Sequence, residues 1–192
     1  MEKKILFVID MQNDFIDGAL GSKDAQRIVP NVVKLIKTFD QDQQIWYTKD
    51  THYDSGDLPY EPKYEDTLEG KMLPIKHCIK STEGWKLNSE VMNALDQYHG
   101  TTTAVYKNTF GSLSMVKDVS MYLWDNVDSK EEIFICGLCT DICVISNALL
   151  LRAQFPNLKI TCYSNCCAGT SPEAHNAALT VMKNCQIDVK EL

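Results

Sequence analysis

The chain has 192 residues, of which 44% are hydrophobic, and this is enough for one domain with a substantial core. Its formal net charge of −7 argues against nucleic acid or an anionic membrane as a binding partner. No apolar run approaches the roughly 20 residues that span a bilayer, and Met1 leads almost directly into a strand-like run, with no secretory signal. We therefore expect a cytoplasmic protein.

Short apolar runs predict buried parallel strands along the whole chain. The first run, residues 4–10, ends in the carboxylate of Asp10. Five more follow, over residues 44–48, 102–107, 132–136, 159–164 and 186–190. Residues 11–22 are predicted as a loop. Residues 49–87 are predicted as a long irregular region, and its aromatic and His residues favour a functional segment.

Helical patterns separate these strands. The expected helices are one with an apolar stripe of Val32, Leu35, Ile36 and Phe39, one that begins after a cap at Asn88, one over residues 112–124, one that contains Cys143, and one over residues 172–184. The alternation predicts an α/β fold, a three-layer, doubly wound sandwich around a six-stranded, mainly parallel sheet. A single domain over residues 1–192 is expected.

The eight cysteines are the most unusual feature of the composition. Disulfide scaffolds are typical of small secreted chains, whereas most of these cysteines lie within apolar strand or helix patterns, so we expect reduced thiols. Cys139 and Cys143 are four residues apart, but no second pair of Cys or His nearby completes a zinc site. A thiol redox or metal-buffering protein is one hypothesis, and the scattered spacing argues against it.

Chemically active residues follow the predicted strands at their carboxyl ends, where open parallel sheets bind ligands. They are Asp10, then Asp50 and His52, then Lys107, and finally Cys143. In one cleft, Asp10 can take a thiol proton, Lys107 can stabilise a thiolate, and Cys143 can attack a carbonyl carbon. The alternative is that Asp10 and Lys107 form an ordinary ion pair and that Cys143 packs in the core.

Cys143 falls in the first turn of a predicted helix, for which Thr140 and Asp141 are good capping residues. A helix N-terminus lowers the pKa of a thiol, so Cys143 is a candidate nucleophile. The backbone N–H groups of Cys139 and Cys143 are candidates for an oxyanion hole.

Three segments carry a resemblance to a known family. They are residues 8–15, Val-Ile-Asp-Met-Gln-Asn-Asp-Phe, residues 107–112, Lys-Asn-Thr-Phe-Gly-Ser, and residues 137–144, Gly-Leu-Cys-Thr-Asp-Ile-Cys-Val. In this order and spacing the chain resembles the isochorismatase-like cysteine hydrolases, which include nicotinamidases and pyrazinamidases, over nearly its whole length. The resemblance implies a catalytic triad of Asp10, Lys107 and Cys143, and a cis peptide bond between Leu138 and Cys139.

The resemblance also implies a metal site. Nicotinamidases of this family bind zinc or iron through an Asp-x-His element, a further His or Glu, and a second His. Asp50 and His52 match the first element and His77 resembles the last. Three residues are candidates for the remaining ligand: Glu69, which is best placed, Glu61 and Glu65. We expect one divalent metal, zinc or iron, and no organic cofactor, although relatives without nicotinamidase activity often lack the metal.

Two residues are predicted to contact the substrate. Phe15 matches an aromatic that packs on the substrate ring in the family, and Leu73 stands where nicotinamidases usually have Trp. Trp85 or Tyr53 replaces that Trp, or the substrate is not aromatic. Four further residues are expected outside the chemistry, Asp14 and Asp141 with structural hydrogen bonds and His99 and His175 at exposed positions.

These observations predict a cysteine-dependent amidohydrolase that releases ammonia from a small carboxamide through a thioester. One alternative is a hydrolase of a ureido or carbamoyl compound, with the same triad and no metal. Another is a non-catalytic member that binds a small molecule or a protein. Relatives are often dimers or tetramers, so we expect a homo-oligomer.

Overall fold

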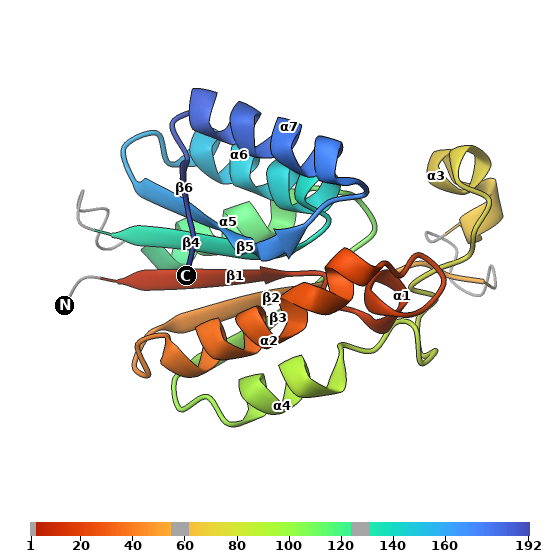
Figure 1. Ribbon diagram of the computed structural model, residues 1–192, viewed down its shortest axis with the longest axis horizontal. Helices are drawn as coiled ribbons and strands as arrows, with labels where there is room; N and C mark the ends of the chain where they lie inside the picture. The colour runs from red at the N-terminus through yellow and green to blue at the C-terminus, as the bar shows by residue number, and fades with distance from the viewer. Residues whose placement is uncertain (1–2, 55–61, 124–130) are drawn as a thin grey trace.

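The computed structural model of the protein describes residues 3–54, 62–123 and 131–192. One six-stranded sheet runs through its centre in the order β3-β2-β1-β4-β5-β6 (Figure 1). Each neighbouring pair of strands is parallel, so the predicted α/β fold is confirmed. The strands are β1 (Lys4–Ile9), β2 (Gln44–Asp50), β3 (Thr101–Lys107), β4 (Glu132–Leu138), β5 (Lys159–Ala168) and β6 (Asp188–Lys190).

Helices cover both faces of the sheet. Figure 1 shows α2 and α4 on one face and α6 and α7 on the other. The α-helices are α1 (Asn13–Ile16), α2 (Lys23–Thr38), α3 (Leu68–Met72), α4 (Ser89–Asp96), α5 (Leu113–Leu123), α6 (Ile145–Gln154) and α7 (Pro172–Asn184). The described residues also form a short 3-10 helix at Tyr64–Asp66 and a short π-helix at Thr140–Val144. Within the described ranges, no helix has the length and apolar character needed to cross a bilayer.

Local sequence signals explain most of these boundaries. β1 is a central strand whose apolar side chains from Ile5 to Ile9 are almost completely buried. The side chain of Asn88 caps α4, as predicted, by accepting from the backbone N–H groups of the first turn. Pro172 occupies the first turn of α7, as predicted. The predicted loop at residues 11–22 is partly wrong, because α1 forms there and buries Phe15 and Ile16.

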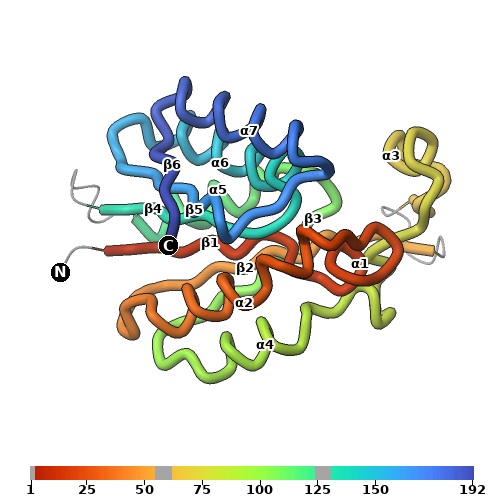
Figure 2. The backbone as a smooth tube through the Cα atoms, viewed as in Figure 1, coloured from red at the N-terminus to blue at the C-terminus, as the bar shows by residue number. Residues whose placement is uncertain are grey.

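The residues predicted for the site follow strands that meet where β1 and β4 are neighbours. Chain connections leave these two strands for opposite faces of the sheet, which opens a crevice beyond their carboxyl ends. The tube in Figure 2 shows α3 projecting beyond this end of the sheet, apart from the helix layers. The residues that follow β1, β2, β3 and β4 therefore converge.

Gly137 lets β4 approach β1 at this point. Its φ is +120°, and a Cβ there would lie 2.1 Å from the backbone oxygen of Ile9 on the paired strand. Only glycine combines this backbone conformation with such a close approach.

We predict that Gly137→Ala lowers the free energy of unfolding by about 3 kcal/mol or more, because the new methyl group strains the backbone and separates β4 from β1. Ile135→Val, at a buried position of the same strand, is the control and costs about 1 kcal/mol. Urea denaturation measures both variants. Equal stability of the two variants would contradict this role of Gly137.

Candidate active site

Asp10 and Lys107 form a buried ion pair at the carboxyl ends of β1 and β3. Nζ of Lys107 lies 2.6 Å from Oδ2 of Asp10, and both side chains are almost fully buried. The other carboxylate oxygen, Oδ1, accepts a 2.6 Å hydrogen bond from the hydroxyl of Thr48, which in turn accepts from the backbone N–H of Asp10. The Asp10 backbone is left-handed, with φ at +46°. The carboxylate is thus held from two sides.

Cys143 completes this group from the turn after β4. Its Sγ lies 3.5 Å from Nζ of Lys107. The sulfur is carried by the π-helix Thr140–Val144, which precedes α6, rather than by the first turn of an α-helix. Asn147 holds that turn, because its side chain donates to the carbonyl of Cys143 and accepts from the backbone N–H of Ser112. The peptide bond between Leu138 and Cys139 is cis, as expected.

Two predictions about this turn are wrong. Thr140 and Asp141 do not cap the helix: the residue at the N-cap is Cys139, and its side chain makes no capping bond. The side chain of Asp141 instead accepts from the backbone N–H and hydroxyl of Thr170. His175 is half-buried rather than exposed, and its Nδ1 lies 2.8 Å from the hydroxyl of Thr140. The two hydrogen bonds from Thr170 are the structural hydrogen bonds that were predicted for Asp141.

The electrostatics of the thiol also differ from the prediction. Burial raises the pKa of Cys143 well above that of a free thiol. Lys107 lowers the pKa, but the negative charges of Asp10 and Asp50 raise it again. Burial likewise raises the pKa of Asp10, against the charge of Lys107. The raised pKa of Cys143 therefore favours a thiol over a thiolate at this position.

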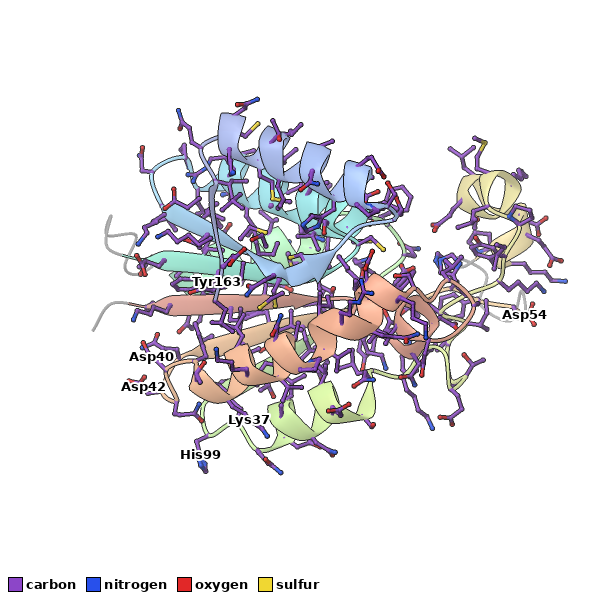
Figure 3. The ribbon with its side chains drawn as sticks, viewed as in Figure 1. Lys37, Asp40, Asp42, Asp54, His99 and Tyr163 are labelled. Carbon is purple, nitrogen blue, oxygen red and sulfur yellow. The ribbon has the colours of Figure 1, made fainter. Side chains whose placement is uncertain are left out.

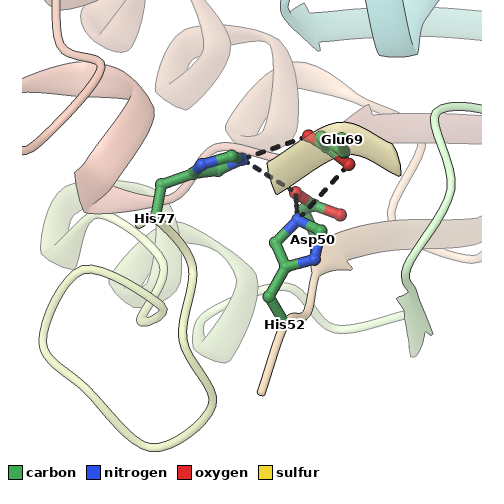
Figure 4. A group of neighbouring side chains, drawn as sticks. All are labelled: Asp50, His52, Glu69 and His77. Atoms are coloured by element: carbon green, nitrogen blue, oxygen red, sulfur yellow. Dashed lines mark hydrogen bonds and ion pairs between the residues drawn. The ribbon is translucent and has the colours of Figure 1, made fainter. Parts of the chain in front are cut away.

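Four potential metal ligands gather next to this group. Asp50, His52, Glu69 and His77 each offer one atom, and these atoms all lie within 4.8 Å of one another. Figure 4 shows the two imidazoles and the two carboxylates facing each other. Nε2 of His52 lies 2.9 Å from Oδ2 of Asp50, and Nε2 of His77 lies 3.4 Å from Oε1 of Glu69. The Nδ1 of His77 lies 2.9 Å from the carbonyl of Ile75, which fixes the ring with Nε2 toward the cluster.

The charges of the cluster favour a cation. Burial works against protonation of His77, but hydrogen bonds to Asp50 and Glu69 raise its pKa to about 10. Burial also opposes ionisation of Asp50, yet hydrogen bonds from His52 and His77, together with Lys107, lower its pKa. Oδ1 of Asp50 lies 3.6 Å from Nζ of Lys107. Asp50 therefore connects the metal-ligand cluster to the buried ion pair.

The three acidic candidates for the fourth ligand have different positions. Glu69, on α3, lies in the cluster. Glu65 pairs instead with Lys76, at 3.1 Å. Glu61 lies outside the described residues.

A cleft of about 800 Å³ opens onto these groups. Cys143 and all four members of the metal-ligand cluster line it, as do Phe15, Leu73 and Tyr53. Trp85 does not line the cleft. Its ring lies over Nζ of Lys49, and its Nε1 donates to the hydroxyl of Thr51. Of the four residues considered for substrate contact, three therefore face the cleft.

Sequence reasoning missed the residues that support the site. Besides Thr48 and Asn147, Gln12 is completely buried and its side-chain amide binds both the N–H and the C=O of Asp50. Asp14 accepts from the backbone N–H of Cys78, next to His77, and so has its predicted structural role. A polar residue at the end of the predicted strand over residues 44–48 was the available signal for Thr48, whereas Gln12 stands in a predicted loop that gave no signal. His99 is exposed and projects from the opposite end of the molecule (Figure 3).

The fold and these side chains define an α/β protein in which a thiol lines a cleft and contacts a buried pair of an ammonium and a carboxylate. The isochorismatase domain family matches residues 4–191. The chain belongs to the isochorismatase family, and the predicted resemblance is confirmed. It is a hydrolase of nicotinamidase-like type within that family.

Two individual relatives are similar to the chain over most of its length. The chain is 30% identical over 186 residues to an uncharacterized isochorismatase family protein, PncA, of Bacillus subtilis, with 95% of each chain covered. It is 28% identical over 185 residues to a probable inactive nicotinamidase of Arabidopsis thaliana, covering 93% of this chain and 87% of the relative.

Solved structures show the same fold. The structure of nicotinamidase/pyrazinamidase PncA from Bacillus subtilis has a TM-score of 0.79 and 26% identity, covering 98% of this chain and 100% of the other. The pyrazinamidase of Pyrococcus horikoshii in complex with zinc has a TM-score of 0.71 and 21% identity, with 99% of each chain covered.

We predict that Asp10→Asn lowers the pKa of Cys143, because the variant removes a negative charge that opposes ionisation and leaves Lys107 beside the sulfur. Asp50 still faces Lys107, so the ammonium keeps a partner. The measurement is a pH titration of thiolate ultraviolet absorbance, taken as the difference from the same chain carrying Cys143→Ala. An unchanged or higher pKa in Asp10→Asn would overturn this electrostatic account.

Proposed function

We propose that the protein is a cysteine-dependent amidohydrolase, which releases ammonia from a small carboxamide through a thioester on Cys143. The observation that carries this proposal is the contact of Lys107 with both Asp10 and Cys143 at one side of an open cleft. An ordinary structural ion pair has no need for a neighbouring sulfur that faces a cavity. The arrangement has the parts of an activated nucleophile.

The first half of the reaction follows from the raised pKa of the thiol. When the amide carbon lies next to Sγ, Asp10 takes the thiol proton as the sulfur–carbon bond forms. Lys107 contacts both Sγ of Cys143 and the carboxylate of Asp10, so it stabilises negative charge on either of them during this step. The N–H groups of Cys139 and Cys143 hydrogen-bond the oxyanion. Asp10 then returns the proton to the leaving nitrogen, the carbon–nitrogen bond breaks, and ammonia departs from a thioester.

The second half uses the same carboxylate. Asp10, again ionised beside Lys107, takes a proton from water as the water oxygen attacks the thioester carbon. When the carbon–sulfur bond breaks, the sulfur recovers a proton from Asp10 and the carboxylic acid product leaves. Because Thr48 fixes one oxygen of Asp10, the other remains directed at Lys107 and the reacting atoms.

The donor set of the cluster fits a divalent metal. Two imidazoles and two carboxylates with compact spacing suit zinc or iron, and the raised pKa of His77 indicates that the carboxylates favour positive charge there. Asp50, His52, Glu69 and His77 would hold the ion, which supplies a Lewis acid for a substrate nitrogen or for water. A pyridine carboxamide such as nicotinamide presents a nitrogen of that kind.

We predict that Cys143→Ala lowers the rate of ammonia release from nicotinamide by about 10⁴-fold or more, because no thioester can form. Cys185→Ala, at a half-buried position near the end of α7, is the matched control and keeps the wild-type rate. A coupled ammonia assay measures both. Turnover by Cys143→Ala at the wild-type rate would refute the proposal, and release from carbamoyl compounds but not from nicotinamide would favour the ureido alternative.

For the metal, we predict that His52→Ala and His77→Ala each weaken zinc binding by about 100-fold or more, because each removes one ligand atom. His99→Ala, at an exposed position far from the cluster, binds zinc like the wild type. Isothermal titration calorimetry with zinc gives the three affinities. Equal affinities would show that zinc binds elsewhere.

A further inference from the structure

The cleft is larger than the proposed reaction requires. Its volume of about 800 Å³ falls in the upper part of the roughly 300–1,000 Å³ that hold drug-sized ligands. Cys143 and the metal-ligand cluster occupy one part of its lining, and a single pyridine ring next to them leaves much of the volume free. The rest of the lining therefore indicates which further chemical groups a substrate of this cleft has.

That remaining lining includes large apolar side chains exposed to water. Leu68 and Met72, both on α3, line the cleft and are 78% and 80% exposed. Phe110, in the loop after β3, lines it as well and is 48% exposed. Covering such side chains with an apolar group is favourable by about 25 cal/mol for each Å² removed from water. Their presence in the lining of the cleft that also holds Cys143 points to an apolar ligand group.

The charges of the side chains that line the cleft argue against an anionic ligand. Among the described residues that line it, none is Lys or Arg. Asp50 and Glu69 are the carboxylates of the lining, and a divalent metal would be matched in charge by these two groups. Lys107 is buried beneath the cleft and paired with Asp10. Outside the metal-ligand cluster, a carboxylate on a substrate would find no Lys or Arg to pair with among the described residues of this lining.

We propose that Leu68, Met72 and Phe110 form an apolar subsite that binds the uncharged, apolar part of a primary amide larger than a single ring. The placement of the amide end beside Cys143 rests on the proposed function, whereas the apolar subsite rests on the lining alone. A substrate of this class is an alkyl- or aryl-substituted carboxamide. Carbamoyl amino acids and other anionic ureido compounds do not fit it.

A second copy of the chain is the other possible occupant of this apolar surface. The small-molecule assignment is favoured because Leu68, Met72 and Phe110 line the same cavity as Cys143, so their surface is continuous with the catalytic group. A flat protein surface would leave the interior of the cleft open.

The test measures binding of uncharged straight-chain amides to Cys143→Ala, which cannot turn them over. Isothermal titration calorimetry compares butanamide, hexanamide and octanamide with adipamate, the anionic counterpart of hexanamide. We expect affinity to rise about threefold for each added methylene, below the roughly fourfold of complete burial. Adipamate is expected to bind at least tenfold more weakly than hexanamide.

Two matched variants, added to Cys143→Ala, locate the subsite. Met72→Ser is expected to weaken octanamide binding about tenfold. Met121→Ser removes a methionine that is 68% exposed on α5 and does not line the cleft, and it should leave the affinity unchanged. Light scattering of Leu68→Ser and Met72→Ser reports on the oligomeric state.

Several outcomes overturn the subsite: affinity that is flat with chain length, equal effects of Met72→Ser and Met121→Ser, or adipamate that binds as tightly as hexanamide. A dimer that dissociates in Leu68→Ser and Met72→Ser while amide affinity is unchanged assigns the surface to an interface between copies. Absence of ammonia release from every amide by the wild-type protein refutes the proposed function, but the binding series still decides the subsite.

Discussion

The ion pair between Lys107 and Asp10 is the interaction on which the rest of the site depends. Both charged groups are almost completely out of water, and an isolated buried charge costs several kcal/mol. Each is tolerated because the other neutralises it and because Thr48 and Cys143 provide further contacts. Removing the charge of Lys107 leaves Asp10 without this ion-pair partner, whereas removing the charge of Asp10 leaves Lys107 with Asp50, 3.6 Å away.

Strand register delivers these groups to one place. Lys107 pairs in register with Asp50 across β2 and β3, so both side chains lie on the same side of the sheet at its carboxyl edge. A slip of one residue would turn either side chain to the opposite face. Asp50 then faces Lys107 with one carboxylate oxygen and the histidines with the other. The Cys143 sulfur, through Lys107, and the metal-ligand cluster are thereby parts of one electrostatic unit.

Much of this arrangement could be predicted from the sequence, because it follows from local patterns. Apolar runs located the strands, and the polar residues at the ends of the runs gave Asp10, Asp50, Lys107 and Cys143. The pKa of the thiol could not be predicted, since it depends on how completely distant segments bury Cys143. The role of Gln12 was also hidden, because its partner Asp50 is distant in sequence and becomes a neighbour only in the folded sheet.

The most direct test of the account is to trap the covalent intermediate. Wild-type protein is mixed with nicotinamide, quenched with acid during turnover, digested and examined by mass spectrometry. The account predicts a nicotinoyl group on the peptide that contains Cys143, which hydroxylamine removes. Rapid ammonia release with the acyl group on another residue would contradict the central claim that Cys143 is the nucleophile.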